Sequence, residues 1–294
     1  MIGQDVLELL TDTVVRLSGD GWEAEVILSD HNRRLQVLSH GGPNLAGLVG
    51  GLRREAESHG FGKVFLKAMP LERPALEAAG MTAEATIWRY FRDADAVVMS
   101  LFLGPERLHR PFAEEEAEIL EAVTARPPET EPRDLPVGYV EATATEADVA
   151  DLARLYDRVF ASYPFPITDS GYLEATMRSH VVYRIIRNAS GEVVAAASAE
   201  TDVEQGHAEL TDFATRPDQR GHGLALRLLA GLEQEMGERG IEGLYTIARA
   251  RSFGMNRVFY NRGWEFTGTL VNNCHIAGRL EDMHVWCGSD SVAG

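Results

Sequence analysis

Apolar and polar positions in the first part of the chain alternate in short runs, which is the pattern of β-strands. Three such runs extend from Thr13 to Leu17, from Glu23 to Leu28 and from Arg34 to Leu38. A longer stretch from about Leu45 to Ser58 has the spacing of a helix instead. This part of the chain is therefore predicted to form a sheet with a helix packed against it.

The second half of the chain alternates between helical and strand-like patterns. Apolar residues at helical spacing predict one helix that begins near Thr145, a suitable N-cap, and another that begins near Leu224. Two runs, Val181 to Ile186 and Val193 to Ser198, flank a turn signal and predict a hairpin. Further strands are predicted at Thr211 to Thr215, Tyr245 to Ala248, Trp264 to Val271 and Met283 to Trp286, and shorter helices at Tyr172 to Met177 and Ser252 to Asn261.

Two segments of the chain share one order of elements. Residues 60–103 and residues 240–286 both run glycine, strand, short helix, Gly-Met or Gly-Trp, strand, turn and strand. Gly80 in the first segment occupies the place of Gly263 in the second. The similarity predicts an internal repeat, in which the N-terminal domain is a degenerate copy of the C-terminal one. A generic α/β domain with chance similarity is the alternative.

Residues 111–137 differ in composition from the parts on either side. Five glutamates between positions 114 and 121 crowd one predicted helix, and four prolines follow between positions 127 and 136. Because prolines limit backbone freedom, this segment is predicted to be a linker of limited flexibility. The predicted divisions are an N-terminal domain at 1–110, the linker at 111–137 and a C-terminal domain at 138–294.

Composition narrows the classes of partner. The 294 residues include 28 basic and 45 acidic side chains, which gives a formal net charge of −17. An anionic nucleic acid or membrane surface is therefore not expected as a partner, whereas a cationic amine suits the field of the protein. An acidic surface that only favours solubility is the alternative.

Neither a membrane span nor a secretion signal is expected from the sequence. No uncharged apolar stretch approaches the ~20 residues that span a bilayer. The N-terminal residues carry acids rather than the basic start of a signal peptide. The two cysteines, Cys274 and Cys287, suit a reduced cytosolic protein, and no spacing predicts metal ligands. A cytoplasmic protein without a metal is expected, and homodimer formation stays open.

The segment from Thr211 to Leu229 carries the clearest chemical signal. A strand that stops at Pro217 leads into a glycine-containing loop and then into a helix. The first amides of a helix lack partners and favour anions, and glycine lets a ligand approach the backbone closely. A phosphate or pyrophosphate ligand is therefore predicted here. The loop and first turn comprise Arg220, Gly221, His222, Gly223, Leu224 and Ala225.

This loop lacks the lysine of a P-loop and, at Leu226, the third glycine of a dinucleotide fingerprint. Its remaining pattern, Arg-x-x-Gly-x-Ala, resembles the coenzyme A loop of the GNAT acyltransferase superfamily. Five blocks further resemble the β-lysine Nε-acetyltransferase family. They are YPFPITD (163–169), ELTDFATRP (209–217), RGHGLA (220–225), YTIARARSFGMN (245–256) and NNCHIAGRLEDMHVW (272–286).

The resemblance implies an α/β protein with mixed sheets. Its C-terminal domain is expected to have the GNAT fold, and its N-terminal domain to be a degenerate GNAT-like half that binds no coenzyme A. The implied activity is N-acetyl transfer from acetyl-CoA to a small amine, with the ε-amine of β-lysine as first choice, in compatible-solute synthesis. Another amine (a polyamine, an amino acid or a peptide) and a non-catalytic acyl-CoA-binding regulatory module stay open as alternatives.

The resemblance also implies the cofactor contacts. The pantetheine arm of acetyl-CoA is expected beside Phe213 and Thr215, and its pyrophosphate at residues 220–225. Ser252 and Asn256 lie near the start of the next predicted helix, where the superfamily often has an asparagine, and are predicted to contribute.

Acetyl transfer needs a base for the amine and an acid for the departing thiolate. Asp212 is the first choice as base and Glu209 the second, because both lie on the strand that precedes the loop. Either carboxylate could instead form a salt bridge or bind a cationic substrate. The acid in the superfamily is often a tyrosine at the position of Phe259. Tyr260, about 100° further round the helix, is therefore the candidate acid.

A β-lysine site must hold one carboxylate and one amine and leave the second amine free to react. Arg249 is predicted to bind the carboxylate through paired hydrogen bonds, although an exposed arginine without this role is the alternative. Glu200, on the neighbouring strand, is predicted to bind or deprotonate an amine. The remaining predicted substrate contacts are Tyr163, Phe165, Asn272 and Asn273. The two aromatic residues could instead belong to the hydrophobic core, and the two asparagines to a turn.

Overall fold

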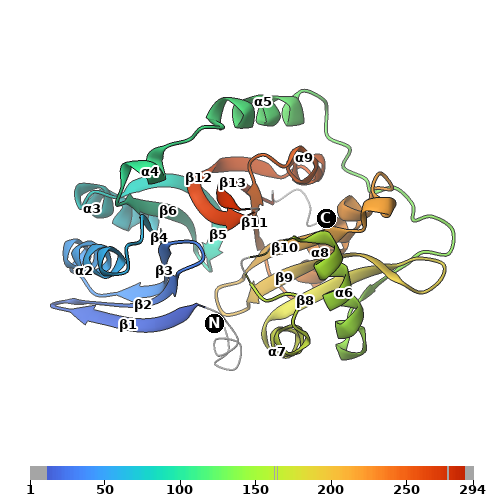
Figure 1. Cartoon of the computed structure of the whole chain (residues 1–294), viewed down its shortest axis with the longest axis horizontal. Coiled ribbons are helices and arrows are strands. Elements are labelled where there is room, and N and C mark those ends of the chain that lie inside the picture. The colour runs from blue at the N-terminus through green and yellow to red at the C-terminus, as the bar shows by residue number, and fades with distance from the viewer. Residues whose placement is uncertain (1–11, 162, 164, 277, 289–294) are drawn as a thin grey trace.

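The computed structural model describes residues 12–161, 163, 165–276 and 278–288. Within these residues the chain forms two mixed sheets that meet near the middle of the molecule (Figure 1). The first sheet has the order β1-β2-β3-β4-β6-β5. Its elements are β1 (Thr13–Gly19), β2 (Trp22–Ser29), β3 (Arg34–Gly41), α2 (Leu45–Ser58), β4 (Lys63–Ala68), η1 (Pro70–Glu72), α3 (Arg73–Ala78), β5 (Thr82–Phe91) and β6 (Ala94–Phe102).

The second sheet is built from the C-terminal half and has the order β12-β13-β11-β10-β9-β8-β7. Its strands are β7 (Val140–Thr143), β8 (Val181–Arg187), β9 (Val193–Asp202), β10 (His207–Thr215), β11 (Gly243–Arg249), β12 (Glu265–Ile276) and β13 (Arg279–Cys287). Its helices are η2 (Glu146–Asp148), α6 (Val149–Val159), α7 (Ser170–Ser179), η3 (Pro217–Gln219), α8 (Leu224–Glu238) and α9 (Phe253–Asn261).

The two sheets have the same topology apart from the additional strand β7. The parallel pair β3 and β4 of the first sheet corresponds to the parallel pair β10 and β11 of the second. A helix, α2 or α8, follows the first strand of each pair, and a final antiparallel hairpin completes each sheet. The α/β fold with a repeated GNAT-like half, predicted from the sequence, is confirmed by this order.

Different layers cover the two faces of the second sheet. On one face α8 packs through Leu228 and Leu232 onto the apolar side chains of β8, β9 and β10. On the other face α6 and α7 pack through Leu152 and Leu173 onto Tyr183 and its neighbours. Among the described residues, no helix is both long and apolar enough to cross a membrane.

The first sheet covers the rest of that second face. Phe65 and Ile87 pack against Leu270 and Val285 in one shared apolar cluster. Beside this cluster the buried ammonium of Lys63 is paired with Glu84 at 2.7 Å and donates to the carbonyl oxygen of Val271 at 2.8 Å. The two halves therefore share a core.

The helical connection α4 (Pro105–Leu108) and α5 (Ala113–Thr124) bridges the two halves across the top of Figure 1. The segment after α5 follows α9, because Arg257 donates to the carbonyl oxygens of Val123, Arg126 and Pro127. Most glutamates of α5 face solvent, as expected for an acidic linker. Glu116 is the exception, since it is buried and paired with Arg110, which also contacts Asp282 at 2.5 Å.

Candidate active site

Strands β10 and β11 separate soon after they meet. Their parallel pairing covers three positions, from His207 opposite Gly243 to Glu209 opposite Tyr245. Beyond Glu209, β10 bulges between Thr211 and Ala214. From Leu210 onward, the edge of β10 that faces β11 makes no strand pairing, so its backbone groups are open to another partner. An extended ligand with amide groups can take that place.

The loop after β10 presents unpaired amides. Gly221 and Gly223 have φ values of 86° and 73°, and Gly223 is the N-cap of α8 without a side-chain capping bond. A Cβ added at Gly221 would meet nothing within 4 Å. Arg220 and His222 are exposed beside these glycines. The loop therefore has the backbone geometry, the space and the positive charge that a pyrophosphate requires.

The corresponding loop of the N-terminal half is closed by its own residues. Asn44 caps α2, because its side chain accepts a hydrogen bond from the amide of Gly47 at 2.8 Å. A Cβ on Gly42 would meet the carbonyl oxygen of Gly21 at 2.4 Å, so the turn between β1 and β2 covers the loop. The amide that an anion would need is thus already satisfied. This supports the expectation that the N-terminal half binds no coenzyme A.

An acidic cluster lies on the sheet face between α6–α7 and the first sheet, at the point where β10 and β11 separate. Glu200 and Glu209 are directly opposite each other on β9 and β10. Burial raises the pKa of Glu200 well above its usual range, and the nearby Glu209 and Asp212 raise it further. Burial also raises the pKa of Glu209, while Lys67 and a hydrogen bond from Tyr245 oppose the shift. Adjacent half-buried carboxylates are stabilised by a shared proton or by a cation, which suits an amine substrate.

Asp212 sits in the bulge of β10 with a φ of 53°. Its two oxygens accept hydrogen bonds from Tyr163 Oη at 2.5 Å and from Ser198 Oγ at 2.6 Å. Burial raises the pKa of Asp212 against the effect of these two hydroxyls. The bulge thus turns Asp212 toward the segment between α6 and α7. Tyr163 is hydrogen-bonded to the acidic cluster through Asp212 and is not only an apolar side of the substrate site. Phe165 packs at the edge of the apolar core beneath α6 and α7.

The N-terminal half adds two residues that the sequence did not point to as functional. Lys67 Nζ lies 3.1 Å from Tyr245 Oη and 4.7 Å from the ring centroid of Tyr90. Tyr90 in turn stacks on His207, the first residue of β10, with ring centroids 3.9 Å apart. The scarcity of lysine was the available signal, because Lys63 and Lys67 are the only lysines in the chain.

Arg249 and the asparagine pair lie at the far end of β11 and on β12. Arg249 Nη2 contacts Glu281 Oε1 at 3.3 Å, so its guanidinium already has a carboxylate partner. The side chain of Asn272 donates to the carbonyl oxygens of Arg107 and His109, both at 2.9 Å. Both amide hydrogens of Asn272 therefore fasten β12 to the segment after α4, which does not favour the predicted contact with substrate.

Asn273 is only 1% exposed, and its backbone carbonyl accepts a hydrogen bond from Arg34 at 2.5 Å. Its side-chain oxygen is buried and has no hydrogen-bond partner among the described residues. The side chain is thus enclosed by protein, although that oxygen remains an available acceptor.

Asn256 is a structural residue in this fold. Its side chain is fully buried and donates to the carbonyl oxygens of Arg249 at 2.9 Å and Ser252 at 2.8 Å. Its oxygen accepts from Trp286 Nε1 at 2.8 Å and lies 3.1 Å from His284 Nδ1. The prediction that Asn256 contacts the cofactor is not favoured, because its polar atoms are used inside the protein. Ser252 is the half-buried N-cap of α9, and a contact between Ser252 and the cofactor stays a prediction.

Phe259 and Tyr260 point in different directions from α9. Phe259 is 1% exposed and packs against Phe213 and Trp264 in the core. The hydroxyl of Tyr260 lies 3.4 Å from the carbonyl oxygen of Thr124, at the end of α5. This contact directs the hydroxyl toward the linker, which does not favour the predicted role of Tyr260 as the acid.

We therefore expect Tyr260→Phe to keep turnover within about 3-fold of the wild-type value, because the lost hydroxyl contacts only the linker. Steady-state kinetics with acetyl-CoA and the preferred amine will test this. A loss of about 100-fold or more, which is typical of a missing general acid, would instead restore Tyr260 to that role.

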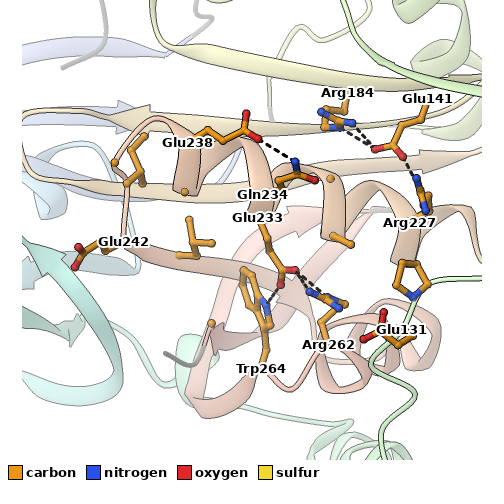
Figure 2. A pocket seen from close by; sticks show the side chains of 18 of the residues that line it. Glu131, Glu141, Arg184, Arg227, Glu233, Gln234, Glu238, Glu242, Arg262 and Trp264 are labelled. Atoms are coloured by element: carbon orange, nitrogen blue, oxygen red, sulfur yellow. Dashed lines mark hydrogen bonds and ion pairs between the residues drawn. The ribbon is translucent and has the colours of Figure 1, made fainter. Parts of the chain in front are cut away.

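A surface pocket of about 1020 Å³ lies elsewhere, along α8 (Figure 2). Its charged side chains already pair with one another: Glu141 with Arg184 and Arg227, each at 2.7 Å, and Glu233 with Arg262 at 2.6 Å. None of the residues predicted for the active site lines it. The open edge of β10, the glycine loop and the acidic cluster therefore favour the place where β10 and β11 separate as the active site.

Comparison with known proteins agrees with this geometry. Residues 148–264 match the acetyltransferase (GNAT) family. The chain is 35% identical to the N-acetyltransferase YodP of Bacillus subtilis over 87% of its length and 92% of the relative. It is 33% identical to the β-lysine N(6)-acetyltransferase of Methanococcus maripaludis over 88% of its length and 93% of that protein. The same-named protein of Methanosarcina mazei is 32% identical over 82% of the chain and 96% of that protein. The chain is an acetyl-transferring enzyme and belongs to the GNAT acetyltransferase family.

Proposed function

We propose that this protein transfers the acetyl group of acetyl-CoA to the ε-amine of β-lysine. The observation that carries the proposal is the half-buried carboxylate pair Glu200 and Glu209, placed where β10 and β11 separate. Two adjacent carboxylates at the acetyl-transfer site favour a cationic acceptor, whose charge stabilises their ionised forms. The names of two relatives that align over most of this chain support β-lysine as that acceptor.

The residues of the C-terminal half fit acetyl-CoA. The open edge of β10 near Phe213 and Thr215 can pair with the amides of the pantetheine arm, and the amides of Gly221 to Ala225 can bind the pyrophosphate. Arg133 of the linker adds a cation, because its side chain lies next to Gly223. When bound, acetyl-CoA supplies an acetyl thioester.

Glu209 is the proposed base. It keeps part of its surface accessible, whereas Asp212 is buried and both of its oxygens accept hydroxyl donors. Glu209 takes one proton from the ε-ammonium, and the neutral nitrogen bonds to the acetyl carbonyl carbon as the carbon–sulfur bond breaks. The second proton that the nitrogen loses passes through water to the sulfur, since Phe259 has no hydroxyl and that of Tyr260 is directed toward the linker. Glu200 holds the second amine, and Asp212 orients Tyr163.

The proposed product loses one of the two positive charges of β-lysine and becomes neutral overall. Such a zwitterion suits a compatible solute, which must accumulate without changing the charge balance of the cell. Acetylation of the terminal amine therefore gives the reaction a physiological purpose as well as a chemical one.

The test is a comparison of kcat/KM for β-lysine, α-lysine, putrescine and a peptide amine with acetyl-CoA. We expect β-lysine to give the highest value. Preference for putrescine or the peptide would refute the substrate while leaving acetyl transfer intact. Binding of acetyl-CoA without turnover of any amine would favour the regulatory module instead.

A further inference from the structure

The N-terminal half faces the acidic cluster with one ammonium group. Lys67 extends from β4 toward the second sheet and contacts Tyr245 Oη at 3.1 Å. Its Nζ also lies over two aromatic rings, 4.7 Å from the centroid of Tyr90 and 5.2 Å from that of Tyr245. Tyr245 is opposite Glu209, so this ammonium reaches the place where β10 and β11 separate.

Lys67 differs from the other lysine of the chain in its partners. Lys63, on the same face of β4, has Glu84 at 2.7 Å. Among the residues that the structure describes, no carboxylate lies within ion-pair distance of Lys67, whose ammonium donates to the hydroxyl of Tyr245. Burial opposes the charge of Lys67, but Tyr90, Glu209 and Glu200 together raise its pKa above the usual value. A charged group in such surroundings is stabilised most by an anion that arrives with a ligand.

The choice of lysine at this position is also informative. All 26 other basic side chains of the chain are arginines, since 28 basic residues include only Lys63 and Lys67. A lysine ammonium is a compact point charge with three donors, whereas a guanidinium is a larger planar group. Beside the hydroxyl of Tyr245, a compact cation suits a small anionic group better than a guanidinium would.

We propose that Lys67 binds the carboxylate of the acceptor, so that the N-terminal half determines preference for an amino acid over a simple diamine. The inference rests on the proposed function of the site. In β-lysine the carboxylate and the β-amine are on neighbouring parts of one end of the molecule. Lys67 contacts Tyr245 on one side of Glu209, and Glu200 is opposite Glu209 on the other side, so the two complementary charges flank Glu209, which the ε-amine is left to reach. Arg249, the earlier candidate, is already held by Glu281.

The experiment compares β-lysine with 1,4-diaminopentane, which is β-lysine without its carboxylate. Wild-type protein should prefer β-lysine. In Lys67→Met we expect kcat/KM for β-lysine to fall about 100-fold, mainly through KM, because a charge-assisted hydrogen bond to the carboxylate is lost. The value for 1,4-diaminopentane should fall much less, since that substrate makes no such bond and the effect of Lys67 on the pKa of Glu209 acts equally on both substrates.

Lys63→Met is the matched control, because it removes the other lysine of β4, which is buried, and its pair with Glu84. It should lower the melting temperature while leaving the ratio of the two substrates unchanged. Lys67→Gln keeps a polar group near Tyr245 and should show the same selective loss, so the test does not depend on Lys67→Met folding well.

Equal losses for both substrates in Lys67→Met and Lys67→Gln, or an unchanged preference for β-lysine, would overturn the role of Lys67 alone. A wild-type protein that prefers 1,4-diaminopentane would overturn the proposed substrate, and the carboxylate contact with it. The first result is seen only in the variants and the second in the wild type, so the two failures are distinguishable.

Discussion

Glu209→Gln is expected to lower kcat by about 100-fold to 10,000-fold, the range found when a general base is removed. Glutamine has nearly the same shape and can still accept a hydrogen bond from Tyr245, but it cannot take the proton of the ammonium. The wild-type kcat/KM should rise with pH through an apparent pKa above the 4.5 of an ordinary glutamate, because burial raises the pKa of Glu209. This rise should be absent in the variant, and a pH series of initial rates will measure it.

Glu204→Gln is the control for this experiment. Glu204 lies exposed in the turn that joins β9 to β10. Its substitution by glutamine therefore removes the same charge as Glu209→Gln but does not affect the acidic cluster. Its kinetics should match the wild type. If Glu209→Gln stays active while Asp212→Asn loses turnover, the base is Asp212, and Glu209 serves to bind the substrate.

The second large effect is expected at the cofactor loop. Gly221→Val should weaken acetyl-CoA binding about 100-fold, equivalent to roughly two charge-assisted hydrogen bonds. Valine does not readily adopt the φ of 86° found at Gly221, and its side chain would fill the space that the pyrophosphate needs. Isothermal titration calorimetry on the full chain will give the dissociation constant.

Gly191→Val provides a matched comparison. Gly191 has a φ of 83°, and a Cβ there also meets nothing within 4 Å, but it lies in the turn between β8 and β9. Both variants should lose similar stability, and only Gly221→Val should lose affinity. Equal affinities in the two variants would show that the ligand does not approach the loop at Gly221.

The elements and the cofactor loop were predictable because they depend on local signals. Helix α2 has the bounds expected from its apolar spacing, Leu45 to Ser58. The positive φ values of Gly221 and Gly223 follow from the absence of a side chain, which the sequence states directly. The repeat could be recognised because both halves keep glycine at corresponding turns, at Gly80 and Gly263.

The partners within the site were not predictable in this way. Tyr163 and Asp212 are 49 positions apart in the sequence, and nothing local indicates that a bulge turns Asp212 toward that tyrosine. Asn256 lies on α9 at a position that suits a ligand contact, yet two other elements use all of its polar atoms. Lys67 reaches the site from the other half of the chain. Such contacts depend on how elements pack, and a single sequence shows only their spacing.

The closed loop at Asn44 has a consequence for how two copies of one fold can take different functions. Two identical subunits would each have to keep a cofactor site, so neither could lose its cofactor loop. Because the two copies here are joined in one polypeptide, they can diverge independently. One retained the open helix start at Gly223, and the other closed its own with Asn44 and turned its sheet toward the acceptor. If Lys67 binds the acceptor as proposed, substitutions in the N-terminal half are expected to change the preferred amine without altering the residues that bind acetyl-CoA.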